Sequence, residues 1–132
     1  MTDNVSAPFW VGIEQFNQRQ FYACHDTLEA IWMDANSSEK NFYQGILQIA
    51  VALYHLENLN WQGSVTLLGE GIYRLRAFSP SYEDIDVQEL VTQSSRLLRV
   101  IQEAGRDGVQ AIAQQLDDRN SPLSYPIVHR LS

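Results

Sequence analysis

The sequence has little of several features that mark particular classes of protein. It contains one cysteine, Cys24, so no disulfide can join two parts of the chain, as is usual in a reducing compartment. The most apolar run, residues 46–56, is interrupted by Gln48 and His55 and is too short to span a bilayer. The first ten residues lack the positive charge and the apolar stretch of a signal peptide. We therefore expect a cytoplasmic protein.

Positive charge is also scarce. Nine basic residues, of which only Lys40 is a lysine, stand against sixteen acidic ones, and the formal net charge is −7. Such a surface repels the phosphate backbone of nucleic acids and anionic membranes, so we expect neither as a partner. The sequence also has no G-x-S-x-G, P-loop or H-E-x-x-H motif and no cysteine cluster. The common catalytic signatures are therefore missing.

What is present is a series of helical patterns. The four prolines stand at positions 8, 80, 122 and 126, and the long stretches between them show helical spacing of apolar residues but no alternating β pattern. The sequence predicts an all-α protein, a compact bundle of five or six helices around a central buried helix. We expect one domain, residues 1–132, that ends in an irregular tail over about residues 117–132.

Caps and breaks divide this pattern. Pro8 can open a first helix, and a second follows over about residues 20–35. Asn36 with Glu39 predicts the start of the central helix, about residues 38–57, which is apolar nearly all round and must therefore be surrounded by others. A fourth helix begins near residue 61. Asp86 with Glu89 caps a fifth, which we expect to end at residue 105 before a short sixth over residues 109–116.

The stretch FYACHDTLEAIW in the second helix carries the first candidate site. His25, Asp26 and Glu29 interrupt an apolar run, and His25 and Glu29 are four residues apart, within about 40° of each other around the helix. They lie at the edge of the apolar stripe, and Trp32 continues their side of the helix. A neighbouring helix could therefore cover them.

The central helix carries a matching polar stripe that is lined with small residues. Its members are Asn41, Gln44, Gly45, Gln48, Ala52 and His55. We expect His25 and Glu29 to be substantially buried, within hydrogen-bonding reach of each other or of this helix, and close to Gln48 or His55. Replacing His25 by alanine should then destabilise the fold by roughly 1–3 kcal/mol through the partner left unsatisfied.

Two functions fit this cluster, apart from a purely structural hydrogen-bonded network. In the first, the protein is a binding module for a protein or small-molecule partner, with no cofactor and no chemistry of its own. In the second, it is a metal-dependent enzyme of the hydrolase type, in which His25, Glu29 and His55 bind a divalent metal such as zinc and leave a position open for water. Aromatic residues near the ends of the chain, Phe9, Trp10 and Tyr125, would allow a homodimer if they are exposed.

Two segments in the right order resemble the domain-of-unknown-function 309 family, whose members are small all-helical proteins. The first motif appears here as Phe21, Tyr22, His25, Asp26, Leu28, Glu29 and Trp32, and the second as Phe42, Gln44, Gly45, Gln48, Ala50, Tyr54 and His55. The resemblance covers about residues 9–78. Family members often have a glycine in the first turn and a glutamate two residues before the histidine, where this chain has NQRQ and Ala23, which removes one candidate carboxylate. Because the family has no established reaction, the resemblance implies the fold and these residues, but no activity.

Overall fold

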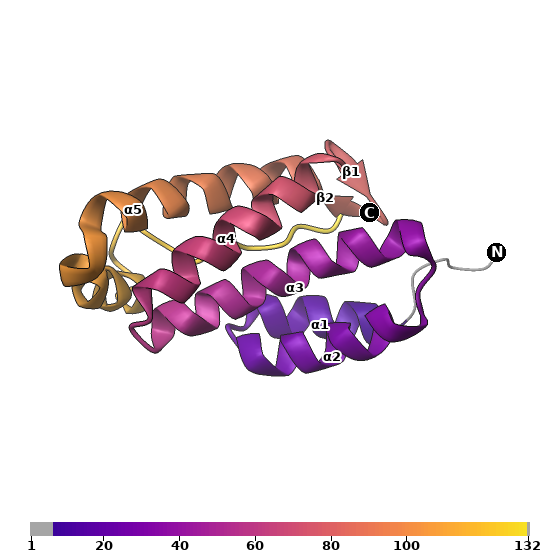
Figure 1. Ribbon diagram of the computed structural model, residues 1–132, viewed down its shortest axis with the longest axis horizontal. Helices are drawn as coiled ribbons and strands as arrows, with labels where there is room; N and C mark the ends of the chain where they lie inside the picture. Colours follow the sequence, from indigo (N-terminus) through magenta and orange to yellow (C-terminus); the bar gives the residue numbers. More distant parts are fainter. Residues whose placement is uncertain (1–6, 132) are drawn as a thin grey trace.

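The computed structural model describes residues 7–131. Over this range the chain forms five helices: α1 (Ala7–Asn17), α2 (Phe21–Asp34), α3 (Ser37–Glu57), α4 (Trp61–Arg76) and α5 (Val87–Asp117). Figure 1 shows α3 running through the middle of the molecule, with α1 and α2 on one side and α4 and α5 on the other. The predicted all-α bundle is confirmed.

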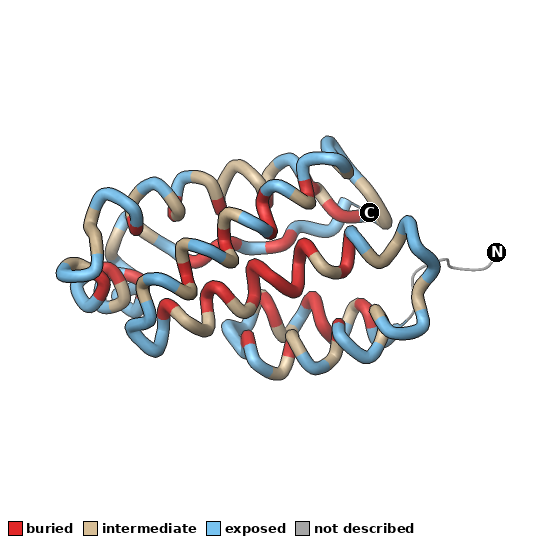
Figure 2. The backbone as a smooth tube through the Cα atoms, in the orientation of Figure 1, coloured by how far each residue is buried: buried red, intermediate tan, exposed pale blue. Residues whose placement is uncertain are grey.

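The central position of α3 follows from its sequence. Its side chains are apolar on almost every side, and most of the helix is buried, as Figure 2 shows by the red colour along its length. Burying one phenylalanine, leucine or isoleucine side chain contributes about 1.5–3 kcal/mol to the stability of the fold. Buried residues of α3 include Phe42, Ile46, Ile49, Leu53 and Leu56. The prediction of a central buried helix is therefore confirmed, with a start one residue earlier than expected.

The helix starts follow the predicted capping residues. The side-chain oxygen of Asn36 accepts a hydrogen bond from the backbone N–H of Glu39 at 2.9 Å, and Asp86 does the same for Glu89 at 3.0 Å. Asn60 caps α4 in the same way, accepting from Gly63 at 3.0 Å. Each cap satisfies a backbone donor that the first turn of a helix leaves unpaired.

Helix α5 is interrupted where the sequence predicted an end. Gly105 has φ 69° and ψ −177°, a conformation that only glycine adopts readily, and it breaks the helical path inside α5. The segment beyond it is the predicted sixth helix, which continues from the fifth without an intervening loop. Its apolar residues Val109, Ile112 and Leu116 are buried.

A short hairpin between α4 and α5 was not predicted. Between the two helices the chain forms strands β1 (Ser81–Tyr82) and β2 (Ile85–Asp86), which pair in antiparallel fashion. Glu83 and Asp84 make the turn with positive φ angles, 51° and 64°. Two-residue strands leave too few positions to show an alternating pattern, so hydrophobic periodicity could not predict them.

The tail after α5 is irregular, as predicted, but it packs along the bundle. Asn17 of α1 holds Val128 at both backbone groups, donating to its carbonyl at 2.9 Å and accepting from its N–H at 2.8 Å. Further along, the N–H of Asp86 donates to the carbonyl of His129 at 2.9 Å, and Ile85 forms a bridge with Arg130. The tail therefore joins α1 to the hairpin.

The terminal aromatic residues lie inside the molecule rather than on its surface. Phe9 and Tyr125 are 0% and 3% exposed, and the half-buried ring of Trp10 is covered by the guanidinium of Arg130 at 4.1 Å from its centre. The expectation that these aromatic rings are available for a homodimer is therefore wrong. Among the helices of residues 7–131, none has the length and apolar character that crossing a bilayer requires.

Candidate functional site

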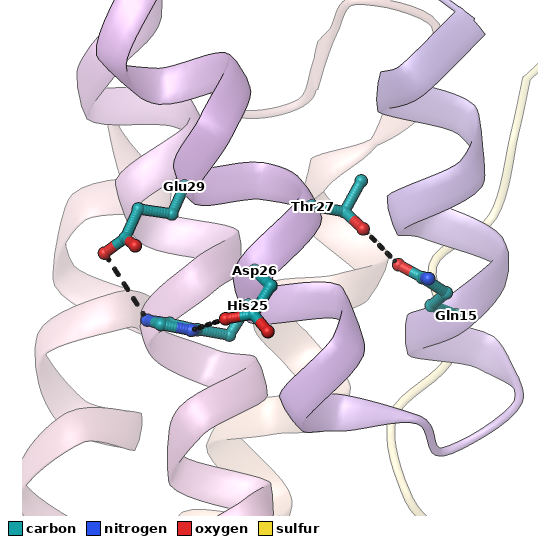
Figure 3. Close-up of polar contacts among 5 residues, drawn as sticks. All are labelled: Gln15, His25, Asp26, Thr27 and Glu29. Atoms are coloured by element: carbon teal, nitrogen blue, oxygen red, sulfur yellow. Dashed lines mark hydrogen bonds and ion pairs between the residues drawn. The ribbon is translucent and has the colours of Figure 1, made fainter.

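The three polar residues of the opening motif form a cluster on one helix. The ring of His25 lies between two carboxylates of α2, with Nδ1 3.2 Å from Oδ1 of Asp26 and Nε2 3.7 Å from Oε2 of Glu29 (Figure 3). The side chain of His25 is 24% exposed, whereas those of Asp26 and Glu29 are 63% and 54% exposed. His25 and Glu29 therefore lie within ion-pair distance of each other but make no hydrogen bond, and the prediction that Glu29 is buried is wrong.

Two tyrosines extend this cluster across to α3. The ring of Tyr22 is exposed and meets the ring of Tyr54 edge-on at 5.2 Å, while its other neighbour is the imidazole of His25 at 5.8 Å. Tyr22, His25, Asp26, Glu29 and Tyr54 together form what we term the α2 outer face. It presents two aromatic rings, an imidazole and two carboxylates on the surface.

The opposite edge of α2 faces α1. There Thr27 donates a hydrogen bond to Oε1 of Gln15 at 2.7 Å, as Figure 3 shows. Between these two edges, Phe21, Cys24 and Leu28 are buried in the core. Burial raises the pKa of the Cys24 thiol to about 12, so the thiolate is scarce near neutral pH and the side chain serves packing. The orientation of α2 thus places His25 and Glu29 outward.

The polar stripe of α3 meets α4 instead of α2. Gln48 is buried, and its amide nitrogen donates to Oε1 of Glu70 at 3.1 Å while its carbonyl oxygen accepts from Nε of Arg74 at 3.1 Å. A second bond links Nη1 of Arg74 to Oδ1 of Asn41 at 2.9 Å. We term Asn41, Gln48, Glu70 and Arg74 the α3–α4 polar network. It satisfies the Gln48 amide inside the helix pair.

Glycines explain why this face of α3 accepts α4. A Cβ atom added to Gly71 would lie 2.8 Å from the carbonyl oxygen of Gly45, so the two backbones approach too closely for any side chain at position 71. The small residues of the stripe therefore accommodate a helix, whereas the sequence suggested a space for a ligand. Glu70 and Arg74 were missed. They flank Gly71 at the spacing of one helical turn, and this pattern could have identified them.

The remaining predicted site residues make contacts with other partners than His25 and Glu29. Nδ1 of His55 accepts a hydrogen bond from the amide of Asn60 at 3.1 Å, and the half-buried ring of Trp32 is covered by the ammonium of Lys40 at 4.8 Å. Gln44 is half-buried. Within residues 7–131, no hydrogen bond or ion pair joins His25 or Glu29 to Gln48 or His55. Within this range His25 and Glu29 therefore have no direct bond to the polar stripe residues Gln48 and His55, and their predicted closeness to these residues stays a prediction.

The geometry does not assemble the three proposed metal ligands. In the part of the chain that the structure describes, no group of three or more His, Cys, Asp or Glu side chains is placed to hold a metal ion. His25 and Glu29 come from one helix, and Nδ1 of His55 is hydrogen-bonded to the amide of Asn60. A catalytic zinc needs three protein ligands that converge on one point, and this arrangement does not provide them.

Comparisons with known proteins agree with the resemblance seen in the sequence. Residues 9–67 match the model of a domain of unknown function, DUF309. A curated relative, the uncharacterised protein YpuF of Bacillus subtilis (strain 168), is 32% identical over 91 residues, which are 68% of this chain and 49% of the relative. The chain thus spans about half the length of that relative. No solved structure matches. The match covers both α2 and α3, and the resemblance to the DUF309 family is confirmed over residues 9–67.

Proposed function

We propose that the protein is a binding module without catalytic chemistry, and that the α2 outer face receives a positively charged segment of a partner protein. The observation that carries this proposal is the exposure of Tyr22, 57%, beside two exposed carboxylates. The module belongs to the cytoplasm in this proposal, in keeping with its single buried cysteine.

The chemistry of this face suits a cation. Tyrosine rings attract ammonium and guanidinium groups through their negative faces, and tyrosine is enriched at protein interfaces because it buries a large area with few rotatable bonds. Asp26 and Glu29 can each accept charge-assisted hydrogen bonds from lysine or arginine. Their nearest partner, His25, uses one oxygen of each carboxylate, so acceptor sites remain free for a ligand.

The metal-dependent alternative has no comparable support. It required His25, Glu29 and His55 to converge, and they do not converge in residues 7–131. The α2 outer face also presents no nucleophile held by a base: its hydroxyl groups are the phenols of Tyr22 and Tyr54. We therefore retain the binding module.

A short arginine peptide tests the proposal. We expect a tetra-arginine peptide with blocked ends to shift the amide NMR signals of residues 22–29 and 54–55 in a saturable way. Replacing both carboxylates, Asp26→Asn with Glu29→Gln, should weaken this binding about tenfold, which corresponds to about 1.4 kcal/mol. Added salt should weaken it as well because the contacts are exposed.

The matched control removes the same two negative charges elsewhere. Glu103→Gln with Asp107→Asn changes two exposed acidic residues of α5 that are four positions apart, close to the three positions that separate Asp26 from Glu29. We expect this variant to bind the peptide nearly as the unmodified protein does. Equal weakening in both variants would show a response to net charge alone and would contradict the proposed site, as would signals that shift over the whole surface.

A further inference from the structure

A second surface, formed where α4 ends beside the first turns of α3, has a different chemistry. A cavity of about 500 Å³ opens there, and it is lined by Asn41, Tyr73, Arg74, Arg76, Ala77 and Phe78. The lining contains two arginines and no acidic residue, although acidic residues outnumber basic ones by sixteen to nine in the chain. The cavity is therefore a local concentration of positive charge on an acidic protein.

The guanidinium of Arg74 is fixed in place by neutral groups. Gln48 and Asn41 accept its two hydrogen bonds, at 3.1 and 2.9 Å, and both acceptors are amide oxygens. Glu70 bonds to the amide nitrogen of Gln48 instead of the guanidinium. Among residues 7–131 no carboxylate lies within ion-pair distance of Arg74. Its charge is thus held in position without being neutralised by a direct ion pair.

Several donors of Arg74 remain available. A guanidinium has five N–H groups, and the bonds to Gln48 and Asn41 use one from Nε and one from Nη1. Both N–H groups of Nη2 and the second one of Nη1 are left, and together they form a fork that matches two oxygens of a carboxylate or phosphate. The side chain of Arg76 makes no hydrogen bond or ion pair within the described range and is exposed.

An alternative explanation is that these arginines only offset the negative end of the α4 dipole, which basic residues in a last turn commonly do. The contacts of Arg74 show that offsetting the helix dipole is not its only role. Its two hydrogen bonds run sideways to α3, and neither goes to a carbonyl at the end of α4. Arg74 is therefore positioned across the helix pair, and it also lines the cavity.

We propose that this cavity binds a small organic anion that carries a carboxylate or phosphate group on an aromatic or apolar body. Arg74 and Arg76 bind the charged group, and the rings of Phe78 and Tyr73 contact the body. Tyr73 is 78% exposed, and its ring can close over a ligand. This site is independent of the α2 outer face, which is built from α2 and Tyr54 and carries two carboxylates.

The test uses small probes that separate charge from shape. We expect benzoate or phenyl phosphate to shift the amide signals of residues 73–78 in a saturable way, whereas benzyl alcohol, with the same ring and no charge, does not. Tighter binding of either anion than of benzyl alcohol supports the proposal, and the anion that binds more tightly identifies the preferred charged group. Benzyl alcohol or inorganic phosphate binding as tightly as the aromatic anions would overturn it, as would the absence of a saturable shift with either anion.

Substitutions locate the site. Arg76→Gln should leave the fold unchanged because the side chain of Arg76 has no partner in residues 7–131. The same variant should bind the tighter-binding probe about fivefold more weakly or worse, since one charge-assisted contact is lost. Arg96→Gln removes the same charge from an exposed position of α5 and should leave binding unchanged. Arg74→Lys keeps the charge but loses the planar fork, so we expect weaker binding, with urea unfolding as a separate check on stability. Equal binding to the Arg76→Gln and Arg96→Gln variants would place the anion elsewhere and overturn the proposal.

Discussion

The α3–α4 polar network and the α2 outer face both gather polar side chains at the edge of a helix, but in opposite surroundings. In the network, the polar groups of two helices bond to each other, and Gln48 is buried among them. On the outer face, His25 bonds only to carboxylates of its own helix, and these carboxylates are exposed. The first arrangement holds two helices together, while the second leaves its hydrogen-bonding capacity free for other molecules.

The difference between these regions comes from glycine. Gly45 and Gly71 allow α3 and α4 to approach until their polar edges meet, and α2 has no glycine. Polar residues at the edge of an apolar stripe can be buried or exposed, depending on how closely the neighbouring helix approaches. The substitutions below test this explanation in order of decreasing expected effect on the free energy of unfolding.

The largest effect should come from Gly71→Ala. The added Cβ would lie 2.8 Å from the carbonyl oxygen of Gly45 and 3.1 Å from the backbone nitrogen of Ile49, so the helices must separate. We expect a loss of about 3 kcal/mol, measured by urea unfolding. Gly69→Ala is the control, because a Cβ at position 69 would have only Leu98 within reach, at 4.0 Å. This substitution should stabilise the helix by about 0.5–1 kcal/mol. Similar losses in both variants would contradict the close approach.

The next effect should come from Gln48→Ala. This change removes the amide that links Glu70 to Arg74 and leaves both without that partner. We expect a loss of about 2 kcal/mol. Gln44→Ala changes the same residue type one turn earlier, at a half-buried position, and should cost less than about 0.5 kcal/mol. If the two losses are equal, the network does not stabilise the helix pair.

A smaller effect should come from Asn60→Ala. Asn60 caps α4 through the N–H of Gly63 and also donates to Nδ1 of His55, so both ends of the α3–α4 turn lose a contact. The loss of a helix cap costs about 1 kcal/mol. Asn60→Asp retains the acceptor for the cap, and in thermal unfolding it should recover most of this stability. If Asn60→Asp is as unstable as the alanine variant, the bond to His55 is the more important of the two.

The smallest effect should come from His25→Ala. Because its partners are exposed and lie on the same helix, we expect a loss of only about 0.2–0.5 kcal/mol in urea unfolding. This corrects the value of roughly 1–3 kcal/mol expected from the sequence, which assumed burial. A loss near the larger value would mean that His25 supports the contact of Tyr22 with Tyr54. Tyr22→Ala as a second variant would then show a similar loss.

Local chemistry made most of the fold predictable. The caps at Asn36 and Asp86 and the break at Gly105 act within a few residues, so the sequence located the helices closely. The candidate site depended on which helix covers the polar stripe of α3, and helical periodicity does not decide that. The predicted partner was α2, whereas the structure brings α4 to it. The burial of Phe9 and Tyr125 was missed for a similar reason: their partners are far away in the sequence.

The attachment of the tail has a consequence for cooperativity. Packing between helices in this molecule runs mainly from each helix to the next along the chain, from α1 to α5. A linear array of this kind tends to lose its outer members first, as repeat proteins do. The two bonds between Asn17 and Val128 join positions 111 residues apart and connect the first helix to the segment after the last one. These bonds connect the two ends of the row of helices. Unfolding of α1 alone, or of the tail alone, would therefore break contacts at the other end of the row as well.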